Sequence, residues 1–137
     1  MISSINLSVG VDRYTVECVA VRCGNDVNVT IGGGDKYHIG AVAIGVPRFE
    51  YKNDKNDEND ENDENDKKRT ASTSVICVQG HREDEVAYRA AKYLSTELGC
   101  VVTVTAGIHV DNIKSEEFQI LLNNIDELLN NIAELLK

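Results

Sequence analysis

The sequence has no tryptophan, and aromatic residues make up only 5% of it. Proteins that hold single-stranded nucleic acids stack the bases on aromatic side chains along a basic groove. Here the formal net charge is −9, so the protein repels the phosphate backbone of a nucleic acid, and it also has few aromatic side chains on which bases could stack. DNA, RNA and anionic membrane surfaces are therefore not expected as partners.

Long apolar runs are also missing. No stretch of about 18 apolar residues exists, so no membrane span is expected. Residues 1–5 lack the basic region and long apolar run of a signal peptide, which predicts a cytoplasmic protein. The cysteines form no C-x-x-C pair, and the cytoplasm keeps thiols reduced. We interpret them as small buried apolar residues rather than metal or redox ligands: Cys18, Cys23, Cys77 and Cys100.

The first third of the chain alternates apolar and polar residues, which is typical of strands. Turn-forming residues such as Gly24-Asn25-Asp26 separate the alternating runs. Pro47 is expected to end the last run, because proline cannot donate to a ladder. Residues 5–46 are thus predicted to form an antiparallel meander with strands at 5–9, 14–23, 27–31 and 41–46.

The central stretch, 73–112, predicts a strand, a helix and a second strand. Val75–Val78 is a β-branched run suited to a strand buried on both faces. Three acids at Glu83–Glu85 favour a helix start, and Gly99 is a suitable C-terminal stop. Cys100–Ala106 is the second strand, so we expect a right-handed crossover between two paired parallel strands.

An amphipathic helix ends the chain. From Ser115, a predicted N-cap, apolar residues recur every three or four positions to the C-terminus. This helix should cover the sheet, and its length leaves the last two turns for self-association. We predict one domain, 1–137, of the α+β class. It is a two-layer α/β sandwich in which an N-terminal antiparallel β-meander precedes β-α-β-α, with a mixed sheet and two helices on one face.

Residues 52–69 interrupt this pattern with Asn-Asp-Glu repeats. The stretch from Asn53 to Lys68 holds eight acidic residues and three lysines, a net charge of −5. It has no apolar residue to bury, so we predict a disordered acidic insert between two strands. Calcium binding is not favoured, because the glycine and terminal glutamate of an EF-hand loop are missing.

The candidate site comes from glycines and histidines that follow strands. Gly80-His81 follows one strand of the central unit, and Gly107-Ile108-His109 follows the other. Gly32–Gly34 precede the polar run Asp35–His38 and the next strand. If that strand is antiparallel to the central pair, all three segments meet at one sheet edge, where ligands usually bind. The alternatives are that each histidine caps a turn and that the glycines form a flexible hairpin loop.

Three segments carry a resemblance to a known family: GGGDKYHIGAVAIG at 32–45, GHREDEVAYRAAKYL at 80–94 and AGIHVDNI at 106–113. Together with the strand and helix order, they resemble the LpdD-like family, small proteins described as prenylated-flavin chaperones for gallate-type decarboxylases. The layout is more distantly similar to the proteasome assembly chaperone family. Both resemblances imply a small, dimeric, non-catalytic protein.

The resemblance implies a binding protein that handles prenylated FMN or FMN for a UbiD-type decarboxylase and acts as a homodimer. In this interpretation the glycine N–H groups contact a phosphate, and the histidines and Tyr37 contact the isoalloxazine edge. We predict the cofactor-binding residues to be Gly32, Gly33, Gly34, Asp35, Tyr37, His38, Gly80, His81, His109 and Asp111.

Two other functions stay open. The first is a protein–protein assembly chaperone without a small ligand. The second is a metal-binding protein that uses the three histidines with Asp35 and Asp111. An enzyme is less favoured, because the sequence shows no nucleophile–base pair.

Overall fold

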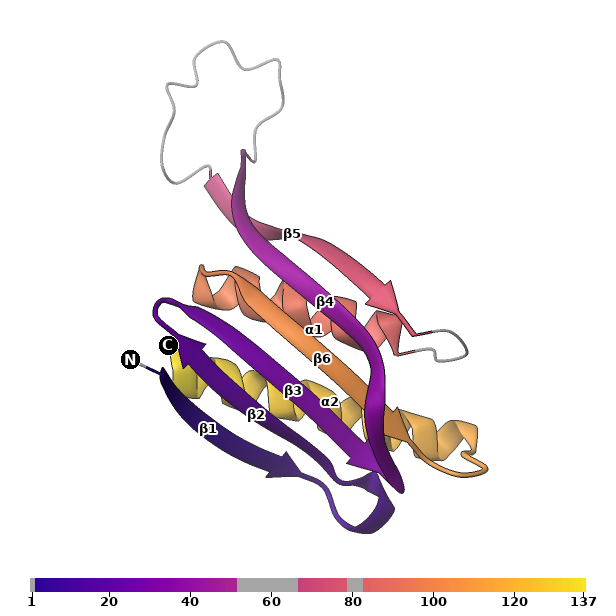
Figure 1. Ribbon diagram of the computed structural model, residues 1–137. Coiled ribbons are helices and arrows are strands. Elements are labelled where there is room, and N and C mark those ends of the chain that lie inside the picture. The colour runs from indigo at the N-terminus through magenta and orange to yellow at the C-terminus, as the bar shows by residue number, and fades with distance from the viewer. Residues whose placement is uncertain (1, 52–66, 79–82) are drawn as a thin grey trace.

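The computed structural model describes residues 2–51, 67–78 and 83–137. Within them the chain forms a six-stranded sheet and two α-helices (Figure 1). The strands are β1 (Ile2–Val9), β2 (Val16–Cys23), β3 (Asp26–Gly34), β4 (Lys36–Tyr51), β5 (Lys67–Cys77) and β6 (Val102–His109). The helices are α1 (Asp84–Leu98) and α2 (Ser115–Leu136), and a short 3-10 turn, η1 (Asp12–Tyr14), follows β1.

The sheet is mixed, with the strand order β1-β2-β3-β6-β4-β5. β3 and β6 pair in parallel, and the other neighbouring pairs are antiparallel. Both helices lie on one face of the sheet (Figure 1). The predicted α+β sandwich, with an N-terminal meander and a mixed sheet, is therefore confirmed.

The pairing of the central unit differs from the prediction. β6 inserts between β3 and β4, so the meander is limited to β1, β2 and β3. β5 and β6 run in the same direction but are not neighbours, because β4 pairs with both of them. The predicted direct parallel pairing was wrong, although the two strands still end at the same end of the sheet. β5 is consequently an edge strand, and Ile76 in the run predicted to be buried is 76% exposed.

The hairpin of β4 and β5 is longer than predicted. β4 passes through Pro47, which pairs with Ala71. A proline is tolerated there because this part of β4 extends beyond its last β6 pair, Gly45 with Val102, and so forms a sheet edge. Residues 67–69 belong to β5 rather than to the predicted insert, and residues 52–66 lie outside the described residues.

Helix α1 lies close to β4 because both carry small residues. Ala87, Ala90 and Ala91 are fully buried on the sheet side of the helix. Beneath them, a Cβ at Gly45 would lie only 2.5 Å from the Ala91 carbonyl oxygen. Gly99 takes the left-handed conformation (φ 65°) at the end of α1, as predicted.

Helix α2 packs against β1 and β2, behind the β1–β3 half of the sheet, and its first turns extend toward the end of β6 (Figure 1). Its last two turns bury Ile132, Ala133 and Leu136, so the stripe predicted for self-association is used within the domain. Ser115 is the first helical residue and not the cap; Lys114 precedes it and makes no side-chain cap bond. Within the part of the chain that the structure describes, no helix is long and apolar enough to cross a membrane.

The cysteines only partly follow the prediction. Cys18 is buried in the core, and burial raises the pKa of its thiol to about 11. Cys100 is half-buried, but Cys23 and Cys77 are exposed because they end the sheet strands β2 and β5. The interpretation as buried apolar residues is therefore right for Cys18 and wrong for Cys23 and Cys77.

Residues 52–66 are expected to be dispensable for stability. Tyr51 and Lys67 are cross-strand partners, so a short Gly/Ser linker can join them as a hairpin. Because residues 52–66 contain no apolar side chain, the replacement should shift the Tm by less than about 3 °C. Thermal unfolding followed by circular dichroism measures the shift.

Arg69→Ala serves as a reference variant that is expected to lose stability, against which the linker replacement is compared. The Arg69 guanidinium donates to the carbonyls of Thr96 at 2.5 Å and Glu97 at 2.8 Å, at the end of α1. Losing these bonds should lower the free energy of unfolding by about 1–2 kcal/mol. A linker variant that loses as much stability as Arg69→Ala would show that residues 52–66 contribute packing.

Candidate functional site

The chain wraps around the end of β6. β3 ends at Gly34 and β4 begins at Lys36, on opposite sides of β6, and both residues pair with His109. Gly34 takes a left-handed conformation (φ 77°), and the N–H of Asp35 donates to the His109 carbonyl at 2.7 Å. This turn therefore brings the residues after the glycines against those that follow β6.

Asp35 is at the centre of a polar network at this end of the sheet. Its carboxylate accepts hydrogen bonds from Arg13 at 3.0 Å and from the N–H of Asp111 at 2.9 Å. Arg13 also donates to the Asp111 carbonyl and lies 3.8 Å from the Glu117 carboxylate. The Tyr14 hydroxyl donates to Glu117 at 2.9 Å, and this bond raises the pKa of the phenol. The network joins η1, the β3–β4 turn and the start of α2.

Two histidines lie beside this network, each paired with a carboxylate. His38 Nε2 is 2.8 Å from Glu83 at the start of α1, and His109 Nε2 is 2.8 Å from Asp111. The two imidazole rings meet edge to face, with centroids 6.4 Å apart. Gly40 leaves room for the Glu83 carboxylate, because a Cβ there would lie 2.2 Å from its Oε2 atom. The His38–Glu83 pair is mostly buried and orients the His38 ring, whereas the His109–Asp111 pair is exposed.

An apolar cavity of about 460 Å³ adjoins His109, between α1, the end of β6 and the first half of α2. Glu83 and His109 belong to its lining, with Glu85 and Arg89 as further polar groups. A mostly apolar cavity with a few polar groups is the usual form of a small-ligand site, and the volume lies in the usual range of about 300–1,000 Å³. Its apolar lining includes Val86, Ile108, Phe118, Leu121, Leu122 and Ile125.

Comparison with known proteins assigns the chain to a family. The sequence model of the prenylated flavin chaperone LpdD-like domain matches residues 10–137. The chain belongs to this family. No curated protein matches it. Among solved structures, it is similar to the crystal structure of a novel chaperone complex for yeast 20S proteasome assembly, at 11% identity and a TM-score of 0.55, covering 98% of this chain and 94% of that one.

Both predicted resemblances are thereby confirmed. The LpdD-like family model covers the three sequence segments that carried the resemblance. The structural similarity to the yeast chaperone complex extends over nearly the whole chain, and at this identity it concerns the fold alone.

In this LpdD-like chain, four predicted site residues meet at one end of the sheet: Asp35, His38, His109 and Asp111. The proximity of His38 and His109 agrees with the expectation that their segments converge. Gly80 and His81 lie outside the described residues. Whether any of these residues binds a cofactor stays a prediction.

The predicted glycine loop is part of β3. Gly32 and Gly33 pair with β2 on one side and β6 on the other, and the Gly34 N–H donates to the Thr15 carbonyl at 3.0 Å. These amides are committed to the sheet, so they do not form the expected phosphate-binding concavity. Tyr37 lies over Gly32, and its hydroxyl donates to Glu17 at 2.7 Å, which raises its pKa. Tyr37 therefore bonds to Glu17 rather than to the histidine cluster.

Four contributors to this site were not predicted from the sequence. Glu83 was assigned only to the helix start, where acids are common, and Arg13 belongs to no motif. Tyr14 and Glu117 carried no motif, since they meet only in three dimensions. The glycine at position 40, which the Glu83 carboxylate contacts, was a usable but unread signal.

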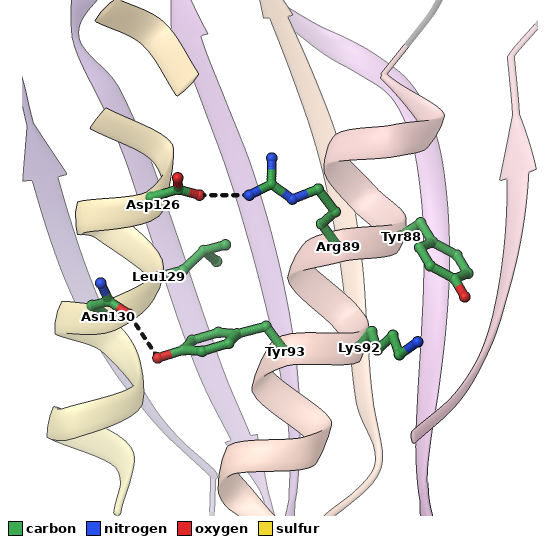
Figure 2. A pocket seen from close by; sticks show the side chains of 7 residues that line it. All are labelled: Tyr88, Arg89, Lys92, Tyr93, Asp126, Leu129 and Asn130. Carbon is green, nitrogen blue, oxygen red and sulfur yellow. Dashed lines mark hydrogen bonds and ion pairs between the residues drawn. The ribbon is translucent and has the colours of Figure 1, made fainter. Parts of the chain in front are cut away.

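A second hollow lies between α1 and α2 (Figure 2). Arg89 and Asp126 form an ion pair across it at 3.0 Å, and the Tyr93 hydroxyl donates to Asn130 at 2.7 Å. These polar groups bond to one another, and none was predicted to bind a ligand. We interpret these two bonds as contacts that hold the helices together across the hollow.

Metal chemistry has little support in the described residues. Over residues 2–51, 67–78 and 83–137, no group of three or more histidine, cysteine or acidic side chains is arranged to hold a metal ion. The hypothesis of a three-histidine site also involves His81, which lies outside these ranges.

Proposed function

We propose that this family member is a non-catalytic chaperone that binds a flavin, prenylated FMN or FMN, for a partner decarboxylase of the UbiD type. The observation that carries the proposal is the apolar cavity of about 460 Å³ that adjoins His109 and the Glu83–His38 pair. A flavin has the matching chemistry, since an apolar ring and prenyl group adjoin a polar pyrimidine edge. Membership of the prenylated flavin chaperone family supports the same ligand class.

Different residues of the cavity would contact different parts of the flavin. The apolar side chains of α2, with Phe118 at 52% exposed, would cover the ring and any prenyl group. His109 lines the cavity and would face heteroatoms at the ring edge, while His38 contacts Glu83, which also belongs to the lining. Among the described residues that line the cavity, Arg89 is the one cation, so it replaces the glycine amides as the candidate phosphate contact; a phosphate there would compete with its ion pair to Asp126.

Phe118→Ala is expected to weaken flavin binding at least tenfold. The side chain lines the cavity, and losing an aromatic contact with a ring is worth about 1.4 kcal/mol or more. FMN titration followed by fluorescence quenching measures the Kd, and prenylated FMN is titrated anaerobically. Leu135→Ala is the matched control, since Leu135 is similarly exposed (55%) on α2 but does not line the cavity.

The outcomes of this titration separate the functions. No binding of either flavin at high micromolar concentration would overturn the proposal and favour a chaperone without a small ligand. Equal Kd values for Phe118→Ala and wild type would show that the flavin binds outside this cavity. Metal analysis of the purified protein tests the three-histidine alternative, and transfer of bound flavin to an apo-decarboxylase tests the partner.

We also propose that the protein acts as a homodimer in the cytoplasm. The resemblance to families of dimeric chaperones supports the dimer. The end of α2 is packed in its own domain, so the contact must use another surface.

A further inference from the structure

The sheet has one face that no described element covers. Both helices lie behind the sheet, and the near face is open (Figure 1). Large apolar side chains stand on it in the middle of the strands, with Val19, Val42 and Ile44 each 40% exposed and Val46 44% exposed. An exposed apolar patch on a regular surface marks an interaction site.

Two complete rows across this open face contain no charged residue. One row of cross-strand partners is Asn6, Val19, Thr30, Thr105, Val42 and Ile76. The adjacent row is Ser4, Val21, Asn28, Thr103, Ile44 and Ser74. In the whole chain 27% of residues are charged, so twelve neutral neighbours on an exposed face are a marked departure. Loss of charge at the centre of a patch is what distinguishes interface cores from other surface.

We propose that this open face binds the open face of a second copy, so that two sheets stack with the helices outside. The inference rests on the proposed homodimer and names its surface. Two chains of net charge −9 repel each other, and a neutral contact region lets them meet without burying unpaired carboxylates. Since a two-fold axis places the same patch on both sides, a neutral, β-branched surface is self-complementary.

The size of the face fits a stable dimer. Six strands about 4.8 Å apart, with about eight residues each at about 3.3 Å per residue, give roughly 700 Å² per copy. Specific interfaces bury about 800 Å² per partner. The polar border also fits, because Glu17 lies at one end of the open face, and Arg48 and Glu50 lie at the other. Stacked sheets of this kind pack about 10 Å apart, with interdigitating side chains.

The test is the mass of the full chain in solution, measured by sedimentation equilibrium and light scattering. Wild type should give twice the 15.1 kDa chain mass at micromolar concentration. Ile44→Lys should raise the dimer dissociation constant at least 100-fold, because it places one charge of each copy in the neutral centre. Asn131→Lys adds the same charge on the exposed surface of α2 and should leave the dimer intact.

A second, milder variant tests the same surface in case Ile44→Lys disrupts the fold itself. Val42→Thr combined with Ile44→Thr keeps β-branched residues in β4 and should raise the same constant at least tenfold with an unchanged circular dichroism spectrum. A monomeric wild type would overturn the homodimer and this surface together. A dimer that survives Ile44→Lys would overturn the surface alone, and the FMN titration remains an independent test of flavin binding.

Discussion

Leu128→Ala is expected to lower the free energy of unfolding by about 2–5 kcal/mol. Leu128 is completely buried in the middle of α2, within the core cluster formed with the sheet. Removing its side-chain atoms leaves a void that the regular strands beneath cannot close. Urea unfolding should show a lower midpoint with an unchanged slope.

Leu135→Ala is the matched control on the same helix. Its side chain is 55% exposed, so the same substitution should cost well under about 1 kcal/mol. Equal midpoints for Leu128→Ala and wild type would show that α2 is not docked on the sheet.

Gly34→Ala is expected to cost more than about 3 kcal/mol, from the sum of backbone strain and overpacking. Gly34 has a φ of 77°, and a Cβ there would lie 2.2 Å from the His109 carbonyl oxygen. The turn over the end of β6 would have to open. The Asp35–His109 hydrogen bond and the polar network that depends on it should be lost with it.

Gly24→Ala separates the two causes. Gly24 has a similar φ of 63°, but a Cβ there would have no neighbour within 4 Å. This variant should cost only the backbone strain, about 1–2 kcal/mol. Urea unfolding of both variants measures the difference, and equal costs would contradict the close approach of Gly34 to β6.

Local signals in the sequence predicted the elements whose limits are set locally. Gly99 ends α1, as predicted, because glycine accepts the left-handed conformation there. Pro47 misled the prediction, because a proline at the edge of a long hairpin resembles a strand end. The insertion of β6 between β3 and β4 had no local signature, since strand pairing depends on contacts between distant residues.

The same distinction holds for the candidate site. Asp35, His38, His109 and Asp111 were predictable because they flank apolar runs of the sequence, although the structure places His38 within β4 and His109 at the end of β6. Arg13 joins them through a contact with a residue 98 positions away, which no spacing rule reveals. The role of the glycines in binding was predicted from their flexibility, whereas the structure uses them for close approach between strands.

The insertion of β6 also governs the order in which the domain can fold. β3 and β4 are joined by a single residue, Asp35, yet the space between them is filled by a strand that begins at Val102. During synthesis β3 and β4 leave the ribosome early. The edge of each strand that later pairs with β6 stays unpaired until residues 102–109 have been synthesised. Such long-range closure slows folding and prolongs the exposure of strand edges to other chains. The sheet is thus completed only after β6 has been synthesised, and the core is completed only when α2 follows.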